Sequence, residues 1–383
     1  MTRVRVLVVD DAVVVRKIVT DALAEDPTIE VVGTAPNGRI ALAKIPQVNP
    51  DVVTLDVEMP EMDGLATLSA IRAQYPRLPV IMFSTLTERG AATTMEALLR
   101  GANDYVTKPA NVGSVAEAQQ RVKAELLPRV HALSGKRPVV IPPPAAAPRA
   151  RLSPALRATG RTTTPTRVDA VVVGVSTGGP NALAALLPQL PADLPVPVLI
   201  VQHMPPMFTR LLADRLDATC ALRVREAGDR QPVIPGQVLI APGNRHLTVQ
   251  RVGTEVRTAL NEGPPENSCR PAVDVLFRTA AGVYGPNTLG LVLTGMGADG
   301  RNGSEHIVAA GGRVLAQDEA SSVVWGMPGA VAAAGVADEI LPLQELAGAI
   351  RRRTAVGRCA PEAGRVATDR RPPTPLAAFG GRR

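Results

Sequence analysis

Short runs of β-branched residues alternate with amphipathic stretches over residues 1–125. The runs are VRVLVV (4–9), EVVGTA (30–35), DVVTLD (51–56), PVIMFS (79–84) and DYVTK (104–108). Segments with helical spacing of apolar residues lie between them, such as 64–75 and 89–102. Strands that alternate with helices predict a doubly wound, parallel five-stranded sheet. In such sheets ligands bind beyond the carboxyl ends of the strands.

A second alternating set of apolar runs begins at residue 168. Its runs are VDAVVVGVS (168–176), VPVLIVQHM (196–204), LGLVLTGMG (289–297) and RVLAQ (313–317). They predict a second α/β domain whose sheet is mainly parallel. Residues 224–250 combine close-spaced Gly and Pro with short alternation, which favours an antiparallel hairpin inserted between its strands.

The rest of the chain divides these two domains from each other and from the C-terminus. Residues 126–167 carry prolines throughout and no sustained period, which is typical of a flexible, partly extended linker. We therefore expect domains at 1–125 and 168–350, joined by this linker and followed by a disordered basic tail at 351–383.

Charge follows the same division. The formal net charge is +7, but it is −3 for 1–125, +8 for 126–167, −5 for 168–350 and +7 for 351–383. The excess positive charge therefore belongs to the linker and the tail. Because no aromatic residues are interleaved with it and no recognition-helix pattern is present, we expect no specific nucleic-acid recognition.

Apolar runs and cysteines set the expected compartment. No run approaches the roughly 20 apolar residues needed to cross a bilayer, so the protein is expected to be cytoplasmic and not inserted in a membrane. Cys220, Cys269 and Cys359 are isolated and lack metal-type spacing. They predict reduced thiols, with neither a disulfide framework nor a zinc site.

Acidic residues stand at the ends of two predicted strands in the first domain. Asp10 and Asp11 follow the first strand, and Asp56 ends the third. Neighbouring ends of parallel strands converge, so these carboxylates predict an acidic pocket suited to Mg²⁺. Lys108 can place an ammonium beside the pocket and Ser84 can offer a hydroxyl to a phosphoryl oxygen. Asp56 would then accept the phosphoryl group.

A plainer interpretation is that these strand ends are merely solvated. Taken together, however, DD at 10–11, TLDVEMPEMDG (54–64), Ser84 and TKP (107–109) resemble the receiver domain of bacterial response regulators. The resemblance covers residues 3–125 and implies a flavodoxin-like fold. It implies that Asp10, Asp11, Asp56 and the carbonyl of Glu58 bind Mg²⁺, and that phosphorylation of Asp56 is relayed by three switch residues: Ser84, Tyr105 and Lys108. Tyr105 also has a plain packing explanation.

The stretch GVSTGGP (174–180) lies between a buried strand and a helical segment. G-x-S-x-G at such a turn is typical of a nucleophile elbow, in which Gly174 and Gly178 allow a tight turn that exposes Ser176. The following helix N-terminus is suited to a developing oxyanion. A phosphate or dinucleotide loop is the alternative, although the G-x-G-x-x-G spacing and the Walker lysine are missing.

A serine nucleophile needs a base and a group that orients the base. Of the four histidines, His203 is the one at a predicted strand carboxyl end, and Asp299 follows another strand in TGMGADG (294–300). Ser176, His203 and Asp299 therefore predict an acyl-transfer triad. Asp299 could instead cap the next helix, and His203 could be a structural histidine.

Six segments of the second domain closely resemble the chemotaxis protein-glutamate methylesterase family, over about residues 168–350. They are GVSTGGP, QHMP (202–205), APGNRHL (241–247), RPAVDVLF (270–277), TGMGADG and DEASSVVWGMPGAV (318–331). The order of receiver, linker and esterase also matches that family. The family often has a histidine where this chain has Cys269, which leaves the role of that position open.

The resemblance implies a phosphorylation-activated hydrolase of glutamyl methyl esters on the cytoplasmic helices of chemoreceptors, with deamidation of receptor glutamines. The implied phosphodonor is the chemotaxis histidine kinase, no cofactor is needed by the esterase, and a monomer is expected. Thr177, Gly178, Met296 and Gly297 are the expected oxyanion and substrate-pocket residues. The alternatives are a phosphorylation-dependent binding module and an esterase of a non-chemotaxis sensory array.

Overall fold

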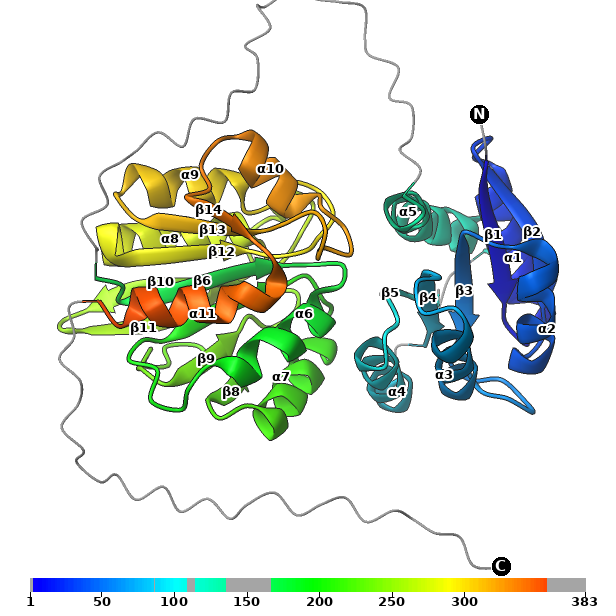
Figure 1. Ribbon diagram of the computed structural model, residues 1–383, viewed down its shortest axis with the longest axis horizontal. Helices are drawn as coiled ribbons and strands as arrows, with labels where there is room; N and C mark the ends of the chain where they lie inside the picture. The colour runs from blue at the N-terminus through cyan, green and yellow to red at the C-terminus, as the bar shows by residue number, and fades with distance from the viewer. Residues whose placement is uncertain (1–2, 86, 109–113, 136–166, 357–383) are drawn as a thin grey trace, which may run out of the picture.

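The computed structural model describes residues 3–85, 87–108, 114–135 and 167–356. Residues 3–135 contain a parallel sheet with the strand order β2-β1-β3-β4-β5 (Figure 1). Its strands are β1 (Val4–Val9), β2 (Ile29–Ala35), β3 (Val52–Asp56), β4 (Val80–Ser84) and β5 (Asp104–Thr107). Its helices are α1 (Val13–Ala24), α2 (Gly38–Val48), α3 (Gly64–Gln74), α4 (Glu88–Leu99) and α5 (Val115–Leu133). The predicted doubly wound fold of this part is confirmed.

Both faces of the first sheet are covered because its central strands, β1, β3 and β4, are apolar at most positions. Leu7 and Val9 of β1 point into the cluster formed with α2, α3 and α4. Val6 and Val8 alternate with them and pack toward α1 and α5. The period of two along a strand therefore divides the core into two layers.

Residues 167–356 contain a second sheet, of seven parallel strands in the order β14-β13-β12-β6-β7-β9-β8. Its strands are β6 (Ala170–Val175), β7 (Val198–Gln202), β8 (Arg223–Glu226), β9 (Gln237–Ile240), β12 (Thr288–Val292), β13 (Arg313–Gln317) and β14 (Glu339–Leu341). The helices are α6 (Gly179–Leu186), α7 (Phe208–Thr219), α8 (Val273–Tyr284), α9 (Arg301–Ala309), α10 (Met327–Ala333) and α11 (Leu343–Thr354). Helices α6, α7 and α11 pack on one face, and α8, α9 and α10 on the other.

The strand order places the catalytic candidates near the carboxyl ends of three adjacent inner strands. β6 lies between β7 and β12, so the chain winds in one direction after β6 and later returns to its other side. A crevice forms at the carboxyl ends of the strands where the winding direction changes. Ser176, His203 and Asp299 follow β6, β7 and β12, respectively.

The predicted hairpin was misplaced. Within 224–250 the structure has β8 and β9, which pair in parallel and extend the main sheet. The antiparallel hairpin lies further along the chain, between β10 (His246–Val252) and β11 (Glu255–Asn261). Short apolar runs between Gly and Pro predict strands but do not specify which neighbour they pair with.

The predicted linker and tail begin too early. Helix α5 is capped by Ser114, which accepts a hydrogen bond from the amide of Glu117, and it continues through Leu133 despite Pro128. Val130 and Leu133, in the last turn of α5, are buried, and this packing offsets the cost of an internal proline. Helix α11 likewise runs through Thr354, past the expected boundary at 351. The rest of the predicted linker and tail, 136–166 and 357–383, lies outside the described residues.

Across the described helices, none combines the length and the apolar character that spanning a membrane requires.

Side chains of the two α/β units meet along α4 and the edge strand β5 of the first unit and along α6 and α7 of the second. Tyr105 of β5 stacks on Phe208 of α7, with ring centroids 4.7 Å apart and an interplanar angle of 13°. The Thr177 hydroxyl donates a 2.7 Å hydrogen bond to Asp104 Oδ2. Helix α4 also packs against α6 and α7. The first unit therefore contacts the residue next to Ser176.

Candidate active site and phosphorylation site

Ser176 follows the central strand β6 directly. Its amide donates to the carbonyl of Thr294 at 3.0 Å, which ties it to the loop after β12. Gly178 has a φ of 78°, and a Cβ there would lie 2.7 Å from Val323. A glycine is therefore required to turn the chain from β6 into α6 at this point.

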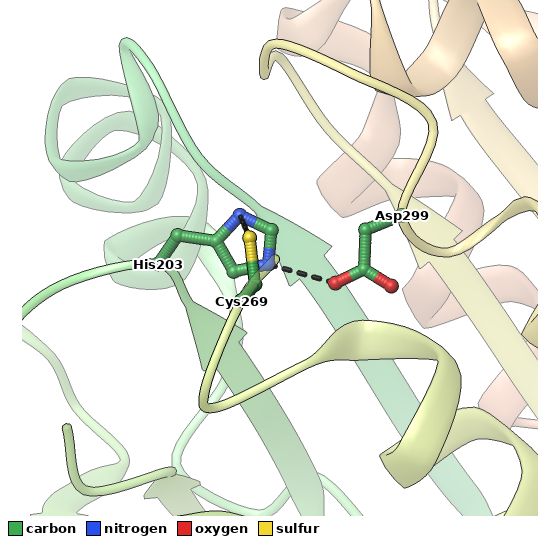
Figure 2. Close-up of side chains that lie close together, drawn as sticks. All are labelled: His203, Cys269 and Asp299. Atoms are coloured by element: carbon green, nitrogen blue, oxygen red, sulfur yellow. Dashed lines mark hydrogen bonds and ion pairs between the residues drawn. The ribbon is translucent and has the colours of Figure 1, made fainter. Parts of the chain in front are cut away.

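His203 and Asp299 form the hydrogen-bonded pair expected of a base and its orienting acid (Figure 2). Nε2 of His203 lies 2.8 Å from Oδ2 of Asp299. Asp299 is 2% exposed, whereas the His203 side chain is 13% exposed. The pair thus places a buried carboxylate behind an imidazole that still reaches the surface.

Asp299 is held by more partners than the sequence predicted. Its carboxylate accepts hydrogen bonds from the amides of Val273, Asp274 and Gly300 and from the side chain of Asn267, at 2.7–3.0 Å. Burial raises the pKa of Asp299, but the hydrogen bond with His203 and these amide donors outweigh it and lower the pKa below its usual value. Asp299 therefore remains charged and does not serve only as a helix cap.

Asn267 and Asp274 belong to this network and were missed at the sequence level. Asn267 donates to both Asp274 Oδ2 and Asp299 Oδ1 at 2.9 Å. Oδ1 of Asp274 accepts from the amides of Gly300 and Gly303. An acidic residue at the start of a buried helix was the available signal for Asp274; Asn267 offered none.

The second ring nitrogen of His203 faces a thiol. Nδ1 lies 3.6 Å from Sγ of Cys269 (Figure 2). Within the described parts of the chain, the Ser176 hydroxyl makes no hydrogen bond with His203. Burial lowers the pKa of His203, but hydrogen bonds with Asp299 and Cys269 outweigh it and raise the pKa to about 9. The two contacts therefore favour the charged form of the imidazole.

The loop after β12 supplies candidate oxyanion donors. A Cβ on Gly295 would lie 2.8 Å from Ser176 Cβ, so this glycine is packed directly against the serine. Its amide is already bonded to the carbonyl of Val324 at 2.9 Å. Over the described residues, no hydrogen bond uses the amides of Met296 or Gly297, which leaves both able to donate to a substrate oxygen.

Two of the predicted pocket residues are occupied by contacts with the first unit. The Thr177 hydroxyl is bound to Asp104, and Met296 packs against the apolar cluster that contains Phe83 and Val106. Both residues therefore lie at the interface between the units in this structure. Gly178 and Gly297 have positive φ values of 78° and 87°, consistent with tight turns on either side of the serine.

At the carboxyl end of the first sheet, Lys108 bridges two buried carboxylates. Its Nζ lies 2.9 Å from Asp10 Oδ2 and 2.8 Å from Asp56 Oδ2. Asp11 is exposed beside them, and one oxygen from each of the three aspartates lies within 4.8 Å of the others. The three aspartates and Lys108 that the sequence singled out are thus brought together.

The surroundings of Asp56 destabilise its negatively charged form. Burial, together with the negative charge of Asp10, raises the pKa of Asp56 to about 6, although Lys108 opposes the shift. The amide of Glu58 donates to Asp56 Oδ1 at 3.4 Å. A cation beside Asp10 and Asp56 would relieve this repulsion, so the donor set fits a hard divalent ion such as Mg²⁺.

Ser84 and Tyr105 contact groups other than the three aspartates. The Ser84 hydroxyl accepts from Thr94 at 2.6 Å and lies 3.2 Å from the carbonyl of Gly90, both in α4. Tyr105 is 8% exposed and stacks on Phe208, and burial raises its pKa. These positions connect the acidic pocket to α4 and to the interface.

Comparison with known proteins agrees with this arrangement. The family model for the response regulator receiver domain matches residues 6–120, and that for CheB methylesterase matches 171–350. A protein-glutamate methylesterase/protein-glutamine glutaminase from Trichodesmium erythraeum is 53% identical over 353 residues, which cover 92% of this chain and 99% of that protein. The chain belongs to this family.

A second relative of the same name, from Nocardioides sp., is 55% identical over 361 residues, 93% of this chain and 96% of its own. The solved catalytic domain of Thermotoga maritima CheB methylesterase is 42% identical and covers 49% of this chain and 99% of that domain, with a TM-score of 0.48. The family resemblance drawn from the sequence is confirmed. The names of these relatives describe a carboxylic ester hydrolase, which is the predicted enzyme class. The alternative of a binding module is therefore not favoured.

Proposed function

We propose that the protein hydrolyses glutamyl methyl esters on the cytoplasmic helices of chemoreceptors and deamidates receptor glutamines, under the control of phosphorylation by a chemotaxis histidine kinase. The observation that carries the proposal is the His203–Asp299 pair at the carboxyl ends of the inner strands of the second sheet, where Ser176 follows the central strand β6. We further propose that it acts in the cytoplasm as a monomer, since one chain holds both the acidic pocket and the catalytic candidates.

In this proposal Ser176 Oγ attacks the ester carbonyl carbon and its proton passes to Nδ1 of His203, because Nε2 is bonded to Asp299. Methanol leaves with that proton, and the substrate acyl group remains on Ser176. Neutral Nδ1 then takes a proton from water, whose oxygen attacks the acyl carbon. Ser176 leaves with the proton and glutamate is released. From a glutamine, ammonia leaves in place of methanol.

The groups around Ser176 and His203 each have a role in these reaction steps. Asp299 stabilises the imidazolium and fixes the ring, and its five hydrogen bonds keep it from moving. The amides of Met296 and Gly297 are the proposed donors to the oxyanion, which forms close to Ser176. Thr177 and Gly178 would line the pocket once the receiver unit withdraws.

We propose Asp56 as the phosphorylated residue of the receiver unit. Asp10, Asp11, Asp56 and the carbonyl of Glu58 would hold Mg²⁺, which when bound offsets charge on the phosphoryl oxygens. Lys108 already contacts Asp56 and can pair with the added negative charge. Ser84 and Tyr105 are the proposed relay, since one contacts α4 and the other contacts Phe208.

The same proposal assigns the domain limits. The receiver would occupy residues 1–125 with its last helix extended to Leu133, and the esterase 168–350 with α11 extended to Thr354. In the unphosphorylated protein, the receiver contacts to Thr177 and Met296 would restrict access to Ser176. Phosphorylation can shift the equilibrium toward the open form only by the free energy with which it stabilises that form relative to the closed one.

The test is methanol release from methylated chemoreceptor membranes by the full chain, with and without an aspartyl-phosphate donor and Mg²⁺. We expect release that increases with the phosphodonor and falls about 10⁶-fold in Ser176→Ala. Asp56→Asn should retain basal release and lose the increase. Absence of release from every receptor preparation, with Asp56 demonstrably phosphorylated, would overturn the esterase assignment.

A further inference from the structure

The cysteine beside the catalytic histidine offers chemistry that ester hydrolysis does not use. Cys269 is half-buried and free of any disulfide, and its Sγ lies 3.6 Å from Nδ1 of His203. Asp299 binds the opposite ring nitrogen at 2.8 Å (Figure 2). A thiol, an imidazole and a carboxylate from three separate segments thus converge within 4.8 Å.

The separation of sulfur and nitrogen matches that of two ligands on one zinc ion. Zinc is bound at about 2.3 Å by thiolate sulfur and at about 2.0–2.1 Å by imidazole nitrogen, in tetrahedral geometry. Two such bonds at a tetrahedral angle place sulfur and nitrogen about 3.6 Å apart. Cys269 Sγ and His203 Nδ1 are 3.6 Å apart. The distance between the two atoms is therefore compatible with chelation of one ion.

The surroundings of His203 also match those of a metal ligand. A metal-bound histidine usually donates its other ring N–H to a carboxylate, which orients the ring and makes it more basic. Asp299 takes this place, and its remaining hydrogen bonds, from Asn267 and the amides of Val273, Asp274 and Gly300, prevent it from turning toward the metal. Water would complete the coordination.

We propose that Cys269 Sγ and His203 Nδ1 form a binding site for Zn²⁺ or a similar thiophilic divalent cation, with Asp299 orienting the imidazole. Binding releases two protons to solvent, one from the Cys269 thiol and one from Nδ1 of the charged imidazole, whose Nε2 proton stays on Asp299's side. The site differs from the acidic pocket at Asp10 and Asp56, whose oxygen donors suit Mg²⁺. Zn²⁺ would thus bind at the sulfur and nitrogen donors of one site, and Mg²⁺ at the oxygen donors of the other.

The consequence for catalysis rests on the proposed function. Nδ1 is the nitrogen that must take the Ser176 proton, and a bound metal ion occupies its lone pair. Zn²⁺ would therefore inhibit ester hydrolysis reversibly, whether or not Asp56 is phosphorylated. Metal inhibition would be a second control on the esterase, independent of the receiver.

Titration of the reduced full-length protein with Co²⁺ tests the site itself. Thiolate ligation gives a sulfur-to-cobalt charge-transfer absorption band, which Zn²⁺ should abolish by competition. We expect the band in the wild-type protein and in the matched controls Cys220→Ser and Cys359→Ser, and its loss in Cys269→Ser. Asp299→Asn should keep the band and weaken cobalt binding by about 10–100-fold.

The outcomes separate the metal site from the enzymatic assignment. A band that survives in Cys269→Ser, or no band in the wild-type protein, would overturn the metal site. His203→Gln provides a second variant, and circular dichroism shows whether each variant is folded. In the activity assay, Zn²⁺ should suppress methanol release by the wild-type protein at least tenfold more strongly than by Cys269→Ser. A Cys269-dependent band without any methanol release would support the metal site and reject the esterase.

Discussion

The pKa of the histidine that must act as a base is raised by its neighbours in this structure. The contact with Cys269 and the hydrogen bond with Asp299 raise the pKa of His203 to about 9 despite its burial. Asp299 is required to orient the ring, so Cys269 is the adjustable partner. Cys269 therefore adds to the effect of Asp299 on the pKa of the base.

The pH dependence of hydrolysis should report this contact. Only neutral His203 accepts the Ser176 proton, so kcat/KM should rise with pH and reach its half-maximum near pH 9. Cys269→Ala removes a contact that raises the pKa, and should move the midpoint to lower pH. Methanol release measured from about pH 6 to pH 10 checks this. An unmoved midpoint in Cys269→Ala would contradict the assignment, and Cys220→Ala is the control.

Unlike His203, Asp56 is a residue whose charged form is destabilised by the fold. Its pKa is raised from 3.8 to about 6, so the folded protein binds a proton here more tightly than the unfolded chain does. The cost of its charge is therefore present above pH 6, decreases as the pH falls through this value, and is absent below pH 3.8.

Asp56→Asn should remove this cost. We expect the variant to be more stable than the wild-type protein by about 1–3 kcal/mol at pH 7.5, with a receiver melting temperature several degrees higher. The difference should shrink toward pH 4. Mg²⁺ should stabilise the wild-type protein more than the variant, and thermal melts of the full chain at both pH values measure these effects. Equal melting temperatures at pH 7.5 would show that burial of Asp56 is not costly.

At the scale of elements, the loop after β12 is fitted against the start of α6. Gly295 lies so close to Ser176 that a Cβ would come within 2.8 Å of the serine Cβ and 2.4 Å of Met327 Sδ. Both neighbours belong to packed elements, so the added atom must displace the serine or the loop. The position of Ser176 therefore depends on a glycine in another strand's loop.

Gly295→Ala should lower kcat for methyl ester hydrolysis about 10²-fold, because an ångström-scale shift of a nucleophile costs this much. Phosphorylation of Asp56 should be unaffected. The matched control is Gly282→Ala in α8, where a Cβ meets no atom within 4 Å and alanine favours the helix. Comparable activity in Gly295→Ala and Gly282→Ala would show that the close contact is not needed to position the serine.

At the scale of the whole molecule, the receiver and the esterase share an interface beside the catalytic residues. Asp104 accepts the Thr177 hydroxyl and pairs with Arg129 at 3.2 Å, and Asn181 donates to the carbonyl of Ala102 at 3.2 Å. Apolar side chains of both units belong to one continuous buried cluster. Such an interface gives the two sites a physical route for coupling.

Asp104→Asn should weaken the closed arrangement. Loss of a charge-assisted hydrogen bond costs about 1.5 kcal/mol, which corresponds to about a tenfold rise in the open fraction. Basal methanol release without phosphodonor should rise by about this factor, and the stimulation by phosphodonor should shrink. Asp338→Asn, which alters an ion pair with Arg313 at the far edge of the second sheet, is the control. A basal rate unchanged by Asp104→Asn would argue against inhibition through this contact.

The sequence by itself determined both parallel sheets and the strand ends that carry Asp10, Asp56, Ser176 and His203. It could do so because apolar strand runs and turn glycines are local patterns. Pairing partners were not local, so the hairpin was placed at 224–250 instead of at β10 and β11. Helix α5 likewise passed Pro128 because distant residues bury its far end.

Only the tertiary structure decided what surrounds the catalytic pair. Cysteine spacing along the chain predicted no metal-type site, yet the fold brings Cys269 to 3.6 Å from His203, 66 residues away. Asn267 and Asp274 reach Asp299 in the same way, and Asp104 reaches Thr177 from the other unit. The local pattern of apolar runs and glycines determines which strand ends bear reactive groups. The packing of distant loops fixes their neighbours, and hence the charge of His203 and access to Ser176.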